Sequence, residues 1–282
     1  MALVHGPPLL DDGWFRLLDV RCVADPPRLS ALEEPPALTL VLPLRGTFIR
    51  QVPRLRHSSE IVADPTVALF FREGEAYRVA HPLGGADRSL DLTIRSVAID
   101  ALGLRPADLP DAASTDAATD VLVRRWATAA AGGDLDPLVA GEVAVAIVDR
   151  VVRRPRDATA QRDVDRLVYQ TRLTVTERLG DRLTLPDLGR LVGCSPFHLA
   201  RRFRAATGTS IHRYRTRLRV RAALERIADG ERDLAGLAID LGFADHSHLT
   251  TTLRRNTGRP PSAFRLPPTA GELREMRTIL QA

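Results

Sequence analysis

The sequence predicts an α+β chain with two domains, a β-rich domain over residues 1–157 and an all-α domain over residues 158–268. Three observations support this fold class. Short apolar runs separated by turn residues occupy residues 37–100, helical patterns follow over about residues 117–152, and the charge changes sign near residue 160. A length of 282 residues with 44% hydrophobic residues suffices for two cores. The end of the chain, residues 269–282, predicts a short helical tail.

The first part of the chain predicts β-structure. The runs ALTLVLPL, GTFIRQV, TVALFF, AYRVA and LDLTIRSVAI are rich in β-branched and aromatic residues. Turn-forming residues separate them at Asp64-Pro65, Glu73–Glu75 and the expected loop His81–Arg88. We therefore expect five or six strands of a sandwich or barrel. If a small molecule binds inside, the pocket would be lined by Leu40, Leu42, Val67, Leu69, Phe71, Tyr77 and Val79, although a filled core would show the same pattern.

Two helices are expected between the strands and the basic part of the chain. The first carries Val121, Leu122, Arg125 and Trp126, and the second carries Leu138, Val139, Val143, Ile147 and Val151. The second helix has one apolar face, which would pack on the sheet or on a second copy of the chain. The polar segment Arg153–Asp163 then marks the domain boundary.

Charge separates the two parts of the chain. All 40 basic residues are arginines, and residues 1–160 have a net charge of −4 whereas the remainder has +9. A basic C-terminal part suggests a polyanionic partner. No secretion signal and no membrane-spanning run is recognised, so we expect a cytoplasmic protein.

The cysteine and histidine positions predict neither a disulfide nor a metal site. Cys22 and Cys194 lie far apart and belong to no Cys/His ligand pattern. The N-terminal part has only His5, His57 and His81, which do not cluster in the sequence. No nucleophile paired with a base is evident. We therefore expect no enzyme activity, cofactor or metal.

The C-terminal part contains an internal repeat. The segment HLARRFRAATG at His198–Gly208 matches HLTTTLRRNTG at His248–Gly258 with an offset of 50 residues. Upstream of both copies, a short amphipathic helix ends at a glycine, Gly193 or Gly242, suited to a left-handed C-cap. A second helix then begins at the N-cap Ser195 or Asp245. Helix, glycine turn and helix is the helix-turn-helix plan, in which the second helix enters a major groove.

From Leu183 to Arg265 the chain resembles the AraC/XylS family of bacterial transcriptional regulators. The residues that carry the resemblance are GCSPFHLARRFRAATGTSIHRY, RLRVRAAL, LAIDLGFADHSHL and TGRPPSAFR, in the family's order and spacing. The resemblance implies two helix-turn-helix subdomains joined by a linker helix, here Ile211 to about Ala228. Read alone, RYRTRLRV alternates like a strand, but its apolar spacing favours a helix. The function implied is sequence-specific binding of double-stranded DNA at a bipartite site.

Leu199 and Phe203 define the buried face of the first recognition helix, so base-reading residues are expected opposite them. Arg201 is the best candidate for a bidentate contact to guanine, and Phe197 for a thymine methyl. In the second copy, threonines replace the arginine and Leu253 replaces the phenylalanine that the family usually has. The predicted DNA-contacting residues are Phe197, Ala200, Arg201, Arg204, His246, Ser247, Thr250 and Thr251, with Arg254 and Arg255 as phosphate contacts.

The resemblance also implies that the N-terminal domain is a cupin-like sensor and that its helices form a homodimer. A small-molecule effector and RNA polymerase are therefore candidate partners. A weakly specific architectural DNA-binding protein is the alternative function, favoured by the threonines of the second copy. An enzyme in the β-rich half is a third and weaker alternative.

Overall fold

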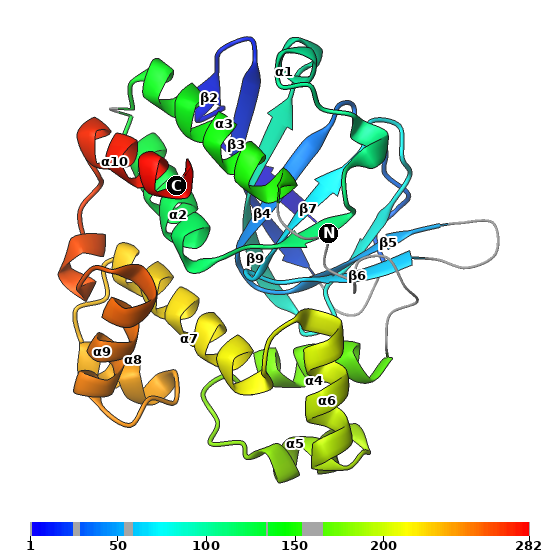
Figure 1. Cartoon of the computed structure of the whole chain (residues 1–282), viewed down its shortest axis with the longest axis vertical. Helices are drawn as coiled ribbons and strands as arrows, with labels where there is room; N and C mark the ends of the chain where they lie inside the picture. Colours follow the sequence, from blue (N-terminus) through cyan, green and yellow to red (C-terminus); the bar gives the residue numbers. More distant parts are fainter. Residues whose placement is uncertain (1, 25–28, 54–58, 134, 154–165, 282) are drawn as a thin grey trace. The chain divides into compact units, whose positions relative to one another are not determined.

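The computed structural model describes residues 2–24, 29–53, 59–133, 135–153 and 166–281 (Figure 1). The chain forms two compact units. Unit 1 comprises Met1–Arg156 together with Pro267–Ala282, and unit 2 comprises Asp157–Leu266. Residues 154–163 of the expected boundary segment lie outside the described residues, as does His57.

Unit 1 is built on two antiparallel sheets. The larger has the order β1-β3-β9-β4-β7-β10 with β2 paired to β3, and the smaller has the order β6-β5-β8. The strands are β1 (Ala2–His5), β2 (Leu10–Asp11), β3 (Phe15–Ala24), β4 (Thr39–Arg45), β5 (Phe48–Val52), β6 (Ser59–Ala63), β7 (Val67–Phe71), β8 (Arg78–Ala80), β9 (Gly85–Ile94) and β10 (Ala112–Ser114).

The expected strands between residues 37 and 100 are β4, β5, β7, β8 and β9, but two boundaries differ. The run LDLTIRSVAI stays extended only to Ile94, because Arg95 is the N-cap of helix α1 (Ser96–Ala101). The expected loop His81–Arg88 is also shorter, because β9 begins at Gly85 and pairs with β3 along ten residues. This long pairing also accounts for β3, which the sequence analysis did not anticipate.

The expected pocket lining does not lie on one face of the sheet. Residues directly opposite one another on paired strands share a face. Leu40 is opposite Phe70, whereas Val41 is opposite Leu69 and Thr39 is opposite Phe71. Leu40 and Leu42 therefore lie on the face opposite to Val67, Leu69 and Phe71. The prediction of a single lining is wrong because strand alternation was not combined with the register of β4 against β7.

A buried arginine ties the two sheets together. Arg50 of β5 is 1% exposed, and its guanidinium donates to the Phe70 carbonyl of β7 at 2.9 Å and to Glu75 at 2.8 Å. The same guanidinium lies 4.6 Å from the centroid of the Phe71 ring. Burial lowers the pKa of Arg50, and the neighbouring acids oppose that shift. These contacts keep the charge paired inside the unit.

Three longer helices besides α1 complete the described part of unit 1. They are α2 (Ala117–Ala131), α3 (Pro137–Val152) and α10 (Ala270–Gln281), and a short 3-10 turn, η1, spans Pro106–Asp108. Val139, Val143, Ile147 and Val151 of α3 are buried as expected, but Leu138 is 68% exposed because it lies in the first turn beside the N-cap Asp136.

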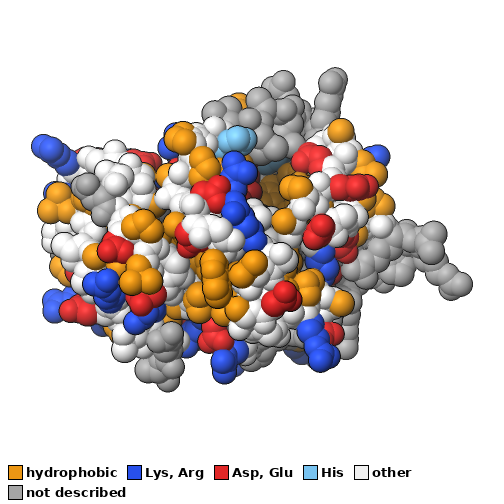
Figure 2. Space-filling view, turned by 90° about the horizontal axis from the view of Figure 1, so that it is seen from above, with side chains coloured by type: hydrophobic (Ala, Val, Ile, Leu, Met, Phe, Trp, Pro, Cys, Tyr) orange, Lys and Arg blue, Asp and Glu red, His pale blue; other side chains and the backbone are white. Residues whose placement is uncertain are grey.

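The predicted tail packs onto this unit. Helix α10 contacts α2 and α3, and Leu273 of α10 is completely buried. Arg277 pairs with Glu142 at 2.7 Å, and Arg125 pairs with Glu272 at 3.3 Å. The segment that the sequence analysis treats as separate thus shares a core with the N-terminal unit. The face of the molecule seen in Figure 2 likewise shows arginine and acidic side chains close to one another.

Unit 2 is all-helical. Its helices are α4 (Arg166–Glu177), α5 (Leu185–Val192), α6 (Pro196–Thr207), α7 (Ile211–Ala228), α8 (Leu234–Asp240) and α9 (His246–Thr257), followed by the 3-10 turn η3 (Pro261–Phe264). The segment RYRTRLRV is helical, as expected, within α7. Among the described residues, no helix has the length and hydrophobicity needed to cross a bilayer.

Candidate nucleic-acid interface

Two helix pairs of the same local build form the candidate interface, α5 with α6 and α8 with α9. Each pair turns at a glycine with a left-handed backbone, Gly193 at φ 75° and Gly242 at φ 74°. Ser195 then accepts a hydrogen bond from the backbone N–H of His198 at 3.3 Å, and Asp245 accepts one from that of His248 at 2.7 Å. These turns and N-caps are the ones that the sequence predicts.

A buried stripe fixes the orientation of α6 and α9. Leu199 and Phe203 of α6 and Leu249 and Leu253 of α9 are completely buried, as the sequence predicts. Phe203 packs against Tyr214 of α7 with ring centroids 5.3 Å apart. Because these residues face inward, the opposite sides of the two helices face solvent.

The candidate residues of α6 fall into two groups. Phe197 is 89% exposed and Arg201 is exposed. Ala200 is half-buried, and together with the exposed Arg204 it borders a cavity of about 440 Å³ among α4, α5, α6 and α7. Phe197 and Arg201 are therefore the side chains of this set that project away from the helix bundle.

The candidate residues of α9 are mostly exposed, namely His246, Ser247, Thr251, Arg254 and Arg255. Thr250 differs because it is half-buried and its hydroxyl lies 3.4 Å from Nε2 of His246.

His248 supports the fold. Its Nδ1 accepts a hydrogen bond from the N–H of Ala244 at 3.2 Å, and its ring packs edge-on against Phe243.

The outward arginines carry charge that the fold does not neutralise. Among the described residues, the guanidinium groups of Arg201, Arg204, Arg254 and Arg255 take part in no hydrogen bond or ion pair. No acidic residue lies within the sequences of α6 or α9. This arrangement creates a positive potential on the exposed sides of both helices.

The junction between the two helix pairs depends on an arginine that the sequence analysis did not single out. Arg219 of α7 is 8% exposed, and it donates to the carbonyls of Leu179, Gly242 and Asp181 at 2.8, 2.8 and 3.0 Å. Burial, with a smaller contribution from Arg215, lowers the pKa of Arg219 to about 10, so the group stays charged at neutral pH. A Cβ at Gly242 would clash with this guanidinium and with the backbone carbonyl oxygen of Gly180, and the φ of Gly242 is positive, so the position requires glycine.

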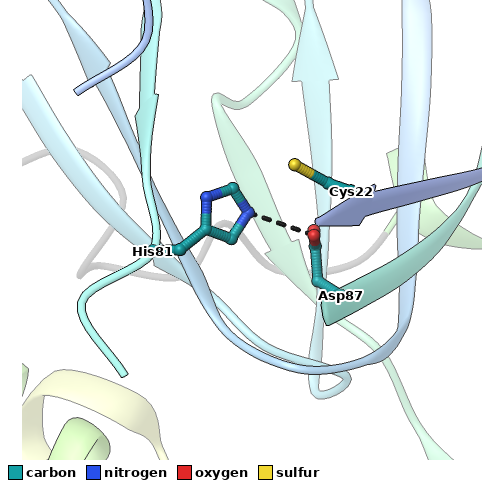
Figure 3. A group of neighbouring side chains, drawn as sticks. All are labelled: Cys22, His81 and Asp87. Atoms are coloured by element: carbon teal, nitrogen blue, oxygen red, sulfur yellow. Dashed lines mark hydrogen bonds and ion pairs between the residues drawn. The ribbon is translucent and has the colours of Figure 1, made fainter. Parts of the chain in front are cut away.

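A second polar cluster lies in unit 1. Cys22, His81 and Asp87 are buried, and Nε2 of His81 lies 3.0 Å from Oδ1 of Asp87 (Figure 3). Burial raises the pKa of the Cys22 thiol to about 11, with further contributions from the charge of Asp87 and a hydrogen bond to it. The expectation that neither cysteine joins a group of ligand-type residues is wrong, because strand pairing gathers residues that are distant in the sequence.

Comparisons with known proteins agree with the geometry of unit 2. A family described as a helix-turn-helix domain matches residues 188–266. A Streptomyces lividans protein named as an AraC-like transcription regulator is 34% identical over 36% of this chain and 34% of its own length. The bifunctional transcriptional activator/DNA repair enzyme AdaA of Bacillus subtilis is 28% identical over 32% of this chain and 43% of its own length. The chain thus spans less than half of either curated relative.

Among solved structures, unsaturated fatty acid-bound ToxT from Vibrio cholerae aligns with 92% of this chain and 97% of its own chain, at 11% identity and a TM-score of 0.38.

The paired helices and the family match place unit 2 in the helix-turn-helix class of DNA-binding domains. Within that class, this part of the chain is similar to AraC-like transcription regulators, and the resemblance seen in the sequence is confirmed.

Proposed function

We propose that the protein is a sequence-specific DNA-binding transcriptional regulator without enzymatic activity. The two helix pairs act as helix-turn-helix subdomains, α7 is the linker helix, and α6 and α9 enter successive major-groove segments about one helical turn apart. The observation that carries this proposal is the pair of exposed helix faces on which Arg201, Arg204, Arg254 and Arg255 have no hydrogen-bond or ion-pair partner among the described residues.

The two recognition helices have different roles in this proposal. Phe197 and Arg201 read bases, because Phe197 contacts a thymine methyl and Arg201 donates two hydrogen bonds to guanine. Ala200 lies beside them, and Arg204 contacts a phosphate from the flank of α6. In α9, His246, Ser247 and Thr251 supply weaker base contacts, with Thr250 close behind them. Arg254 and Arg255 bind phosphates and position the domain.

Unit 1 supplies regulation in this proposal. Its sheets form a cupin-like sensor that responds to an effector, and its helices hold a homodimer that presents two copies of unit 2 to DNA. Contact with RNA polymerase would link DNA binding to transcription. The proposal draws on the division of the chain into two compact units, which gives the sheet its own core.

The first test is selection of genomic DNA fragments by the purified chain at several salt concentrations. We expect a bipartite motif with half-sites about one turn apart. Steeply salt-dependent binding without a motif would support the architectural alternative instead.

Two variants and a matched control sharpen this test. Arg201→Ala should weaken the selected site by about 1–3 kcal/mol and relax preference at one base pair. Arg190→Ala is the matched control, because Arg190 is an exposed arginine of α5 that pairs with Asp187. Equal effects of the two substitutions would contradict the role of α6. Arg254→Ala should weaken binding to all sequences similarly.

A further inference from the structure

The buried cluster of Cys22, His81 and Asp87 is positioned by the fold of unit 1. Cys22 of β3 and Asp87 of β9 are directly opposite each other in the antiparallel pair, so their side chains share one face of the sheet. His81 follows β8 and begins a turn in which the N–H of Gly84 donates to the His81 carbonyl at 3.1 Å. Three separate segments of backbone therefore hold the three side chains together.

The spacing of the three groups fits a metal ion. The thiol sulfur, an imidazole nitrogen and a carboxylate oxygen all lie within 4.8 Å of one another. Bonds of about 2.0–2.3 Å in a tetrahedral zinc site separate neighbouring ligand atoms by about 3.3–3.8 Å. Figure 3 shows the Cys22 sulfur and the Asp87 carboxylate on the same side of the His81 ring, facing one nitrogen. Small side-chain movements would bring all three atoms to bonding distance.

Among the described residues, the side chains of the cluster are hydrogen-bonded only to one another. The His81 side chain is 3% exposed, and its Nδ1 has no hydrogen-bond partner among the described residues. Within the same residues, the only basic group paired with Asp87 is His81 itself. A Cβ at Gly46 would lie 2.7 Å from Cβ of Asp87 and 2.8 Å from its Cα, so the β4–β5 turn packs tightly against the backbone that carries this buried side chain. Asp87 is 8% exposed, and a buried carboxylate is stabilised by a cation.

We propose that Cys22, His81 and Asp87 bind one divalent transition-metal ion, for which Zn²⁺ is the best match. Sulfur and imidazole ligands favour Zn²⁺ and related ions over Mg²⁺ and Ca²⁺, which prefer oxygen. Three protein ligands leave a fourth position for water or for a donor atom of a small molecule. The proposal does not depend on DNA binding by unit 2.

Co²⁺ titration of the chelator-treated full chain tests the site directly, because a cobalt–thiolate bond gives a charge-transfer absorption band. We expect the band to saturate at one ion per chain and to disappear when Zn²⁺ is added. Cys22→Ser should abolish the band, and Asp87→Asn should weaken cobalt binding at least tenfold. Cys194→Ser is the matched control and should keep it, since Cys194 is the other cysteine of the chain and lies in unit 2.

The wild-type chain decides the question even if a variant fails to fold. The proposal is overturned if wild-type protein shows no thiolate–cobalt band, or if its Tm does not rise with Zn²⁺ concentration. A band that persists in folded Cys22→Ser, or that is lost in Cys194→Ser, would also overturn it. Circular dichroism of each variant establishes whether it has folded.

Discussion

Replacing Arg219 with methionine should loosen the junction between the two helix pairs of unit 2. Methionine keeps much of the aliphatic length of arginine but removes all three hydrogen bonds to the carbonyls of Leu179, Gly242 and Asp181. These carbonyls belong to the chain after α4 and to the turn between α8 and α9. Arg219→Met therefore acts on the relative placement of the helix pairs and leaves the exposed side chains of α6 and α9 unchanged.

The expected loss of stability can be worked from the structure. Hydrogen bonds from a charged donor contribute about 1.5–3 kcal/mol each, or roughly 4.5–9 kcal/mol for three. Burial of the guanidinium opposes this, since lowering its pKa from 12.5 to about 10 corresponds to roughly 3 kcal/mol. The difference predicts that Arg219→Met destabilises unit 2 by roughly 1.5–6 kcal/mol, as expected for loss of a buried polar network.

Urea unfolding followed by two probes measures this effect. Both tryptophans, Trp14 and Trp126, lie in unit 1, so their fluorescence reports on that unit, whereas far-UV circular dichroism also follows the helices of unit 2. The variant should shift the circular dichroism transition and leave the fluorescence transition in place. It should also lose more affinity for a bipartite DNA site than for an isolated half-site.

The control is Arg213→Met, the same substitution at an exposed position of α7. If Arg213→Met and Arg219→Met lower stability equally, or if Arg219→Met leaves the circular dichroism transition unchanged, the argument for the junction fails.

Two further predictions concern unit 1. Burial raises the pKa of Asp91 to about 6, although the hydrogen bond from Ser89 acts to lower it. The native state therefore binds a proton at the Asp91 carboxyl more tightly than the unfolded chain does. Protonation of Asp91 should therefore stabilise the fold increasingly as pH falls from 7 towards 4, by at most about 3 kcal/mol. Asp91→Asn should flatten the pH dependence of the free energy of unfolding measured by tryptophan fluorescence. An unchanged pH dependence in this variant would refute the prediction. Deleting residues 267–282 removes the buried side chains of Leu273 and Leu280, whose burial contributes about 1.5–3 kcal/mol each to stability. The deletion should therefore shift the fluorescence-detected unfolding transition to lower urea concentration. An unshifted transition would show that α10 is dispensable for the stability of unit 1.

The sequence predicts unit 2 better than unit 1 because the signals in unit 2 are local. A glycine with positive φ, an N-cap a few residues later and a buried residue every third or fourth position determine α5, α6, α8 and α9 within short windows. The bounds of α7 follow from the N-cap Ser210 and the same apolar spacing. Arg219 was not anticipated because its three partners lie 23 to 40 residues away in the chain.

The features of unit 1 that were missed depend on pairing between distant strands. Strand β3 has a mixed polar sequence, and its structure follows from its register with β9. The same register brings Cys22 to Asp87, a proximity that no spacing rule in the sequence contains. The incorrect pocket lining has the same origin, since the face on which Leu40 lies is set by its partner Phe70.

The difference between α6 and α9 predicts an asymmetric DNA site. Arg201 is exposed without a protein partner among the described residues, whereas the hydroxyl of Thr250 already lies 3.4 Å from His246. Because Arg254 and Arg255 bind phosphates in the proposed function, the second half-site would be held mainly through its backbone. Base changes in the first half-site should cost about 1–3 kcal/mol each, and changes in the second should cost less. Competition binding with a set of single base-pair substitutions measures both halves, and equal costs in the two halves would show that α9 reads sequence as strongly as α6.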